Sequence, residues 1–180
     1  METGRWLIDK THSEIQFKAK HLMITTVTGK FTEYDATIET NGDDFSNARV
    51  TFTAEVNSIT TGNDQRDEHL KSDDFFSADK FPSLKFVSTN IQKISDSDFK
   101  MTGDFTIRDI TKEITLDVEM HGIKKDPYGN TKAGFEINGK VNRKEFGLKF
   151  HVLNEAGDLL VSDDIKILCE VQLQKVNDEA

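Results

Sequence analysis

The sequence predicts an all-β protein: a single domain over residues 1–180, folded as one antiparallel eight-stranded β-barrel with a short helical insertion near residues 63–76. Three observations predict it. Apolar and polar residues alternate along most of the chain, which is the period of a strand with one buried face. Polar turn sequences separate the alternating stretches. One stretch lacks the alternation, and it divides two strands. A length of 180 residues suits one domain with a sizeable core.

Eight strands are expected from this alternation. Six are marked clearly, with apolar residues on one face and polar residues on the other, over 15–21, 50–56, 101–107, 114–120, 135–141 and 165–173. Weaker patterns over 31–38 and 84–91 complete the set. The intervening turns include Asn41-Gly42-Asp43 and the polar loops 95–98, 126–130 and 155–158. Because the alternation runs straight through Asn138-Gly139, we expect Gly139 inside a strand and not in a hairpin turn.

The stretch 62–81 is the one that departs from the β pattern. Asn63 or Asp64 can cap the start of a helix, and residues 65–71 are good helix formers without alternation. Pro82 marks the end of the stretch. We expect the segment to lie against the barrel and to bury its large apolar side chains, which are Leu70, Phe75 and Phe76.

Closure into a barrel follows from the need to hide the apolar faces. An open sheet would leave two exposed edges, whereas a closed one has none, and eight strands leave room for one small ligand. A two-sheet sandwich is the alternative. Small residues on the inward phases favour the barrel, because they are expected to leave volume unfilled: Ala19, Ala54, Gly103 and Gly139. The composition of 13 Phe against one Trp and two Tyr predicts an apolar interior with few hydroxyls.

Charge and composition exclude several classes of function. The net charge of −9 argues against a nucleic-acid partner and against electrostatic docking of the chain on anionic membranes. A single cysteine, Cys169, permits no intrachain disulfide. No stretch approaches the ~18 apolar residues of a membrane helix, so an integral membrane protein is not expected. The N-terminus lacks the apolar run of a signal peptide, which favours a cytoplasmic location; a periplasmic one is the alternative if a signal has been removed.

Several motifs occur in one order along nearly the whole chain. They are Trp6-Leu7-Ile8-Asp9 with His12-Ser13, Arg66-Asp67-Glu68-His69-Leu70, Phe81-Pro82-Ser83-Leu84-Lys85-Phe86, Gly103-Asp104-Phe105-Thr106-Ile107-Arg108-Asp109 and Asn142-Arg143-Lys144-Glu145-Phe146-Gly147-Leu148. Together they resemble the YceI-like, polyisoprenoid-binding family. The resemblance implies a lipocalin-like barrel of bacterial type that binds a long isoprenoid chain, often as a homodimer.

Two sets of candidate ligand contacts follow. The apolar phases of successive strands predict a lipid-binding wall of Phe17, Phe31, Phe52, Phe86, Phe105, Leu116, Phe135 and Ile137. Polar residues of the motifs are candidates for contact with a head group: His12, Arg66, His69 and Arg143. An arginine there could pair with a phosphate through two hydrogen bonds. The alternative is that these side chains tie the helical segment and the chain entry to the barrel.

The sequence therefore predicts a carrier or binding protein for a long isoprenoid-type lipid, such as a polyprenyl phosphate or a quinone. Catalysis is not expected, because the sequence contains no Gly-x-Ser-x-Gly elbow and no glycine-rich phosphate loop. No metal or other cofactor is expected either, since the five His and one Cys lack metal-ligand spacing. Two alternatives remain: an enzyme acting on an isoprenoid lipid, and a stress or structural protein whose barrel is filled by its own side chains.

Overall fold

The computed structural model describes residues 3–152 and 160–177, which leaves the expected turn at 155–158 outside the described residues. The strands are β1 (Thr3–Ile8), β2 (Glu14–His21), β3 (Thr25–Phe31), β4 (Tyr34–Asn41), β5 (Asp44–Glu55), β6 (Ile59–Thr60), β7 (Ser83–Lys93), β8 (Asp98–Ile107), β9 (Ile110–Lys125), β10 (Thr131–Asn142) and β11 (Asp164–Lys175). The helix is α1 (Asp64–Lys71), and short 3-10 turns lie at η1 (Lys10–His12), η2 (Val56–Ser58) and η3 (Arg143–Phe146).

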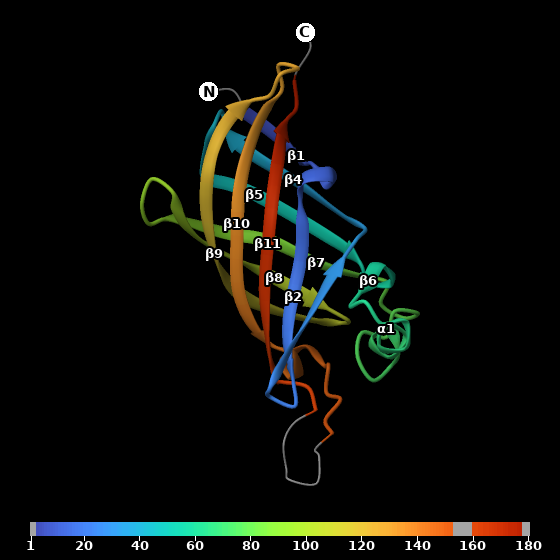
Figure 1. Ribbon diagram of the computed structural model, residues 1–180. Coiled ribbons are helices and arrows are strands. Elements are labelled where there is room, and N and C mark those ends of the chain that lie inside the picture. Colours follow the sequence, from blue (N-terminus) through green and yellow to red (C-terminus); the bar gives the residue numbers. More distant parts are fainter. Residues whose placement is uncertain (1–2, 153–159, 178–180) are drawn as a thin grey trace.

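Eight of these strands form a closed antiparallel barrel, as predicted (Figure 1). The ring runs β1-β4-β5-β7-β8-β9-β10-β11 and closes where β11 pairs with β1, for example Leu173 opposite Ile8. The other half of β11 pairs with β2, with Glu170 opposite Glu14. Strand β2 continues into β3, which pairs with the two-residue β6 through Lys30 and Phe31. The β2–β3 hairpin is thus a flap that extends the wall at one end of the ring.

One strand prediction was wrong in detail, and one strand of the ring was missed. The stretch 31–38 is not one strand, because β3 ends at Phe31 and β4 begins at Tyr34. Phe31 and Tyr34 are both buried. In one continuous strand an odd and an even position face opposite sides, so the burial of both residues indicates the turn between them. Strand β1 was not expected as a strand, since only Trp6 and Ile8 supply a clear apolar phase in it.

The inward glycines do not leave empty volume, contrary to the expectation. A side chain at Gly103 would overlap the ring of Phe86, and one at Gly139 would overlap the side chain of Leu116. These positions are glycines because a neighbouring large side chain lies over them. Gly139 does lie inside β10, as predicted. Ala54 is fully buried and does not contact the cavity, whereas Ala19 does.

The helical segment contains one short helix. Asn63 caps α1, and its side chain accepts a hydrogen bond from the Arg66 backbone N–H at 3.0 Å. Asp67 anchors the helix, because its Oδ1 accepts hydrogen bonds from the backbone N–H and the hydroxyl of Thr61 at 2.9 and 2.6 Å. Phe75 is buried as predicted. Leu70 and Phe76 are only half-buried, because they border the cavity described below. No helix among the described residues has the length and apolar character needed to cross a membrane.

Candidate ligand cavity

A cavity of about 260 Å³ occupies the interior of the barrel. Every strand of the closed ring contributes to its wall, from Ile8 of β1 to Leu173 of β11. Among the described residues that line it, only Gln16 and Arg143 carry a side-chain nitrogen or oxygen. The amide of Gln16 donates a hydrogen bond to Glu14 at 2.7 Å. The cavity is therefore suited to an apolar molecule and offers almost no polar contact within its wall.

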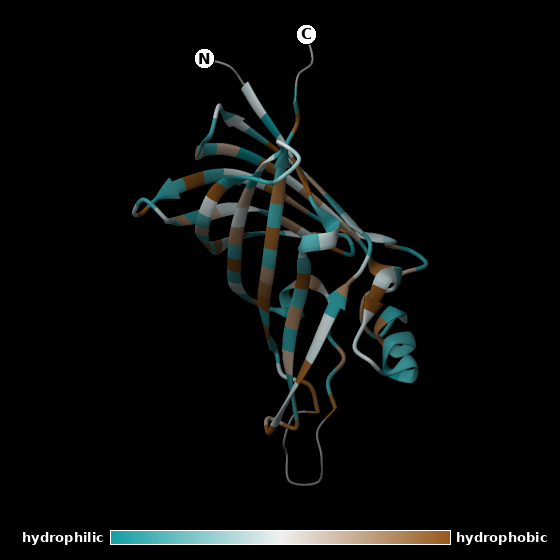
Figure 2. Cartoon of the chain, turned by 45° about the horizontal axis from the view of Figure 1, so that its top comes forward, coloured by the Kyte–Doolittle hydropathy of each residue, from teal (hydrophilic) through white to brown (hydrophobic). Residues whose placement is uncertain are grey.

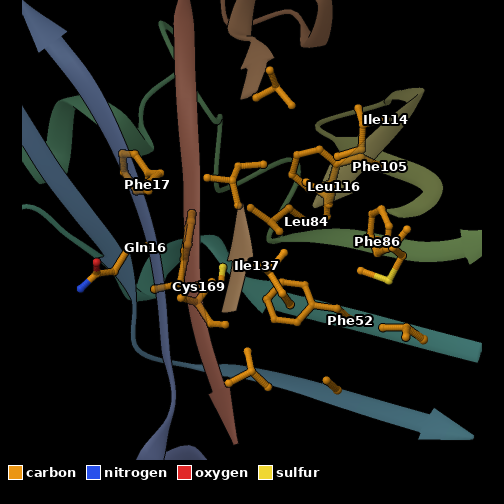
Figure 3. A pocket seen from close by; sticks show the side chains of 18 of the residues that line it. Gln16, Phe17, Phe52, Leu84, Phe86, Phe105, Ile114, Leu116, Ile137 and Cys169 are labelled. Carbon is orange, nitrogen blue, oxygen red and sulfur yellow. The ribbon is translucent and has the colours of Figure 1, made fainter. Parts of the chain in front are cut away.

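All eight side chains predicted to contact lipid line this one cavity: Phe17, Phe31, Phe52, Phe86, Phe105, Leu116, Phe135 and Ile137 (Figure 3 labels most of them). Figure 3 shows Phe52 and Ile137 together on the inner side of the barrel, yet both remain half-buried. An inward side chain that stays partly accessible faces a hollow and not a packed core. The structure thus places the eight residues in a common interior, while their contact with lipid stays a prediction.

Aromatic side chains and only a two-residue ladder, between β3 and β6, close the wall between the β2–β3 flap and the helical segment. The rings of Phe17 and Phe31 lie 5.7 Å apart, and Phe31 packs edge-on against Phe76 at 6.2 Å. The first residues of β3, from Thr25 to Gly29, pair with β2 and with no other described strand. Beyond the short β3–β6 pairing at Lys30 and Phe31, this side of the cavity is held by side-chain packing, which opens at a lower energetic cost than a hydrogen-bonded ladder.

Arg143 is the one head-group candidate that reaches the cavity wall. Its guanidinium is buried and donates hydrogen bonds to the backbone carbonyls of Ser162 and Leu148, at 2.9 and 2.7 Å. Asp163 lies 3.6 Å from its Nη2. Burial lowers the pKa of Arg143, and the nearby Asp163 carboxylate opposes that shift. The side chain therefore holds the loop that follows η3 against the start of β11.

The other three candidates lie outside the cavity wall: Arg66 and His69 on α1, and His12 in η1. Arg66 donates hydrogen bonds to the carbonyl and hydroxyl of Thr61, each at 2.7 Å. His69 lies 2.8 Å from Asp74. His12 Nδ1 lies 3.0 Å from Asp9. The structure does not bring the four candidates into one head-group site. The alternative expected Arg66 and His69 to tie the helical segment to the barrel, whereas these contacts join residues within 61–74.

Several wall residues were missed by the sequence reasoning. Phe45 and Ala48 line the cavity from β5, although Phe45 does not share the even-numbered phase of Val50 and Phe52. The pairing of β4 with β5 shifts register between Glu39 and Asn41, which changes the phase. The Asn41-Gly42 turn lies beside this shift and is the sequence feature that could have indicated the change of phase at Phe45.

Cys169 also lines the cavity. Burial raises the pKa of its thiol to about 11. The thiol is therefore protonated at neutral pH and is a weak nucleophile.

The pattern of the YceI-like domain matches residues 6–173. The chain belongs to the YceI-like family. This YceI-like chain is 39% identical over 159 residues to a UPF0312 protein of Staphylococcus aureus (strain USA300), which covers 88% of the chain and 90% of that relative. It is 35% identical to the solved YceI protein of Campylobacter jejuni, with a TM-score of 0.77 over 88% of the chain and 90% of that structure.

Two more distant structures share the fold alone. BcnA of Burkholderia cenocepacia is 19% identical, with a TM-score of 0.78 over 92% of the chain and 98% of that structure. A domain of Saccharophagus degradans is 13% identical, with a TM-score of 0.67 over 95% of the chain and 98% of that structure. That domain is described as a polyisoprenoid-binding domain implicated in plant cell wall breakdown.

Proposed function

We propose that this YceI-like protein binds one long-chain isoprenoid-type lipid inside its barrel and sequesters or carries it. The observation that carries the proposal is a hollow, apolar cavity whose wall comes from every strand of the ring. The polyisoprenoid binding attributed to the structurally similar Saccharophagus domain supports the same class of ligand. Each CH₂ group moved from water into such a wall contributes about 0.8 kcal/mol, so a chain of a few isoprene units supplies most of the affinity.

The polar end of the lipid is expected in contact with solvent and not within the cavity wall. Arg143 is the only charged side chain among the described wall residues; three of its N–H groups donate to backbone carbonyls, and Asp163 lies 3.6 Å from its Nη2. A phosphate buried elsewhere in the described wall would lack a partner of opposite charge, which is costly. A polyprenyl phosphate would therefore keep its phosphate in solvent, whereas a quinone ring could enter further.

Binding is favoured over the two alternative functions. A barrel filled by its own side chains does not fit the half-buried Phe52 and Ile137 on its inner face. Catalysis within the cavity would need a nucleophile or an acid–base group, and the protonated Cys169 thiol is a poor candidate. The homodimer implied by the family resemblance and the cytoplasmic location stay predictions; light scattering on the purified chain tests the first.

Native mass spectrometry with lipid extraction tests the proposal. The chain purified from bacteria should carry one lipid per polypeptide. Ala36→Phe should abolish this binding, because Ala36 faces the cavity from β4. Thr37→Phe is the matched control, since Thr37 is the next residue of the same strand and faces solvent. Chains that remain lipid-free after exposure to bacterial lipid extract, or an Ala36→Phe variant that binds as the wild type does, would refute it.

The substitutions Gly103→Leu and Ala54→Phe, which also add bulk at inward positions, are poorer tests than Ala36→Phe. Leucine at Gly103 would collide with Phe86, and phenylalanine at Ala54 would enter packed core, because Ala54 lies outside the cavity wall. Both would lower stability whether or not lipid binds.

A further inference from the structure

Apolar side chains are exposed at the end of the molecule opposite the two chain termini (Figures 1 and 2). Met23 and Ile24, in the turn between β2 and β3, are 55% and 77% exposed. Val152 is 42% exposed. Backbone hydrogen bonds connect the two segments, because the Leu22 N–H donates to the Leu160 carbonyl at 3.1 Å and the Leu160 N–H donates to the Val152 carbonyl at 2.9 Å. These five residues are named the apolar tip.

The backbone conformation of the turn within the apolar tip is unfavourable for Leu22 and Met23. Leu22 and Met23 have φ of 51° and 58°, and the Ile24 N–H donates to the His21 carbonyl at 3.1 Å. Positive φ at both central residues defines a type I′ turn, for which Asn-Gly is strongly preferred. Large apolar residues are disfavoured there by their Cβ atoms, and they are exposed to water as well. Both folding and solubility would favour small or polar residues in this turn. We therefore infer that the side chains of Leu22, Met23 and Ile24 contact a partner.

The strands beside the apolar tip are basic, although the chain as a whole is acidic. The protein has 32 Asp and Glu against 23 Lys and Arg, yet residues 15–32 contain Lys18, Lys20 and Lys30 and no carboxylate. Lys149 is exposed on the other segment. Asp163 and Asp164, which follow the tip, pair with Lys144 and Lys140 at 3.2 and 3.6 Å. Glu155 and Asp158 fall within residues 153–159, outside the described residues.

The apolar tip also adjoins the cavity. Val161, next to Leu160, lines the cavity and forms an isolated bridge with His21, which precedes the turn. Lys20 exchanges hydrogen bonds with Ser162, at 2.9 and 3.0 Å. Ala19 lines the cavity from the same strand. A partner that covers the tip would therefore lie next to the end of the cavity.

We propose that the apolar tip and its flanking lysines dock on the surface of a bilayer that contains anionic phospholipids. Exposed Met and Ile side chains enter the boundary between head groups and acyl chains, and the lysines contact the anionic head groups. The surface goes beyond the proposed cavity ligand and does not depend on it. The net charge of −9 concerns the whole chain, whereas docking depends on the charge of the end that faces the membrane.

Sedimentation with lipid vesicles tests this surface. The purified full-length chain should bind vesicles of phosphatidylcholine mixed with phosphatidylglycerol, bind phosphatidylcholine vesicles more weakly, and lose binding as salt is raised. Replacing Leu22→Asn, Met23→Gly and Ile24→Thr together should reduce binding about tenfold or more, because the apolar contacts are lost. This variant should fold at least as well as the wild type, since Asn-Gly suits the turn. Lys18→Gln and Lys20→Gln should each reduce binding to the anionic vesicles about fivefold.

The control variant is Ile94→Thr, because Ile94 is 53% exposed between β7 and β8, away from the apolar tip. It should bind vesicles as the wild type does. Wild-type chain that binds neither kind of vesicle at low salt would overturn the proposal. So would a turn variant that binds normally, or a wild-type dimer that dissociates in the turn variant without any vesicle binding, since the tip would then be a protein interface. Ala36→Phe should retain vesicle binding even if it loses lipid from the cavity, which separates this proposal from the cavity proposal.

Discussion

The two ends of the barrel differ in how they use apolar side chains. At the end that carries both termini, Trp6 is fully buried, packs against Phe45 with ring centroids 5.1 Å apart, and donates its indole N–H to the Thr40 hydroxyl at 3.0 Å (Figure 1). At the other end, Phe17 is only half-buried and Ile24 is exposed. The first end is a packed floor, and the second is held by looser side-chain contacts. The difference predicts ligand exchange at the second end, although that end also holds buried side chains such as Arg143, which donates to the Ser162 carbonyl beside the apolar tip.

The largest expected effect tests the floor. Trp6→Ala should lower the free energy of unfolding by about 3–5 kcal/mol, because a fully buried ring is lost and a cavity remains. Phe17→Ala should cost less than half as much, since Phe17 is half-buried. Denaturant unfolding followed by circular dichroism measures both. Equal losses for the two variants would show that the ends do not differ in packing.

The next effect concerns Arg143. Arg143→Met should cost about 3 kcal/mol, because the buried carbonyls of Ser162 and Leu148 lose their donors. The matched control is Lys144→Met, since Lys144 also pairs with Asp163 but is more exposed, and such pairs contribute about 0–1 kcal/mol. If lipid affinity fell in Arg143→Met while its stability stayed unchanged, Arg143 would be a head-group contact and not a structural tie.

A smaller effect is expected for Phe76, at the looser side of the cavity. Phe76→Ala should cost about 1–2 kcal/mol, because the ring is half-buried and borders the cavity. It should also accelerate lipid exchange, since Phe76 packs against Phe31 beside the stretch of β3 that pairs only with β2. Stopped-flow transfer of lipid to acceptor vesicles measures that rate. An exchange rate equal to that of the wild type would place the route elsewhere.

The smallest effect is the pH dependence of Asp9, beside the floor. Burial raises the pKa of Asp9, but hydrogen bonds from Lys132, Thr11 and His12 outweigh it and hold the pKa well below its usual range. A carboxyl whose pKa is lower in the folded state stabilises the fold above its unfolded pKa, and that contribution is lost as pH falls through the folded value. We expect about 1–2 kcal/mol to be lost in this way during acidification of the wild type.

Asp9→Asn should remove this part of the acid dependence. The remaining carboxyls contribute equally to both proteins, including Asp44, whose pKa is lowered by its hydrogen bonds with Ser46. The difference between the two unfolding curves at neutral and acidic pH therefore isolates Asp9. Parallel curves would show that the contacts with Lys132 and His12 do not hold in solution.

The sequence predicts the barrel and the residues that line its cavity better than it predicts the turns at the barrel ends and the contacts of polar side chains. Alternation places Phe52 and Ile137 inside because strand geometry fixes the face of every second residue. It cannot show that Gly103 lies under the ring of Phe86, since that contact joins two strands. The turn at Leu22 and Met23 has no Gly or Asn, so no turn signal marks it.

The head-group candidates failed to converge for a related reason. His12, Arg66 and Arg143 belong to motifs on different elements, and nothing in a local pattern reports whether those elements face one cavity. In the structure only Arg143 does. In the structure the motif residues Arg66 and Arg143 make contacts that hold the fold together, and contact with a ligand stays a prediction.

The most direct test of lipid binding is a titration of the delipidated chain with a long-tailed prenyl quinone, followed by the fluorescence of Trp6. Trp6 is the single tryptophan and contacts Phe45, which lines the cavity, so a quinone bound there should quench it. The account predicts saturable quenching at one quinone per chain in the wild type and in Thr37→Phe, and none in Ala36→Phe. Quenching that is absent in the wild type, or equal in all three proteins, would contradict a lipid-binding cavity.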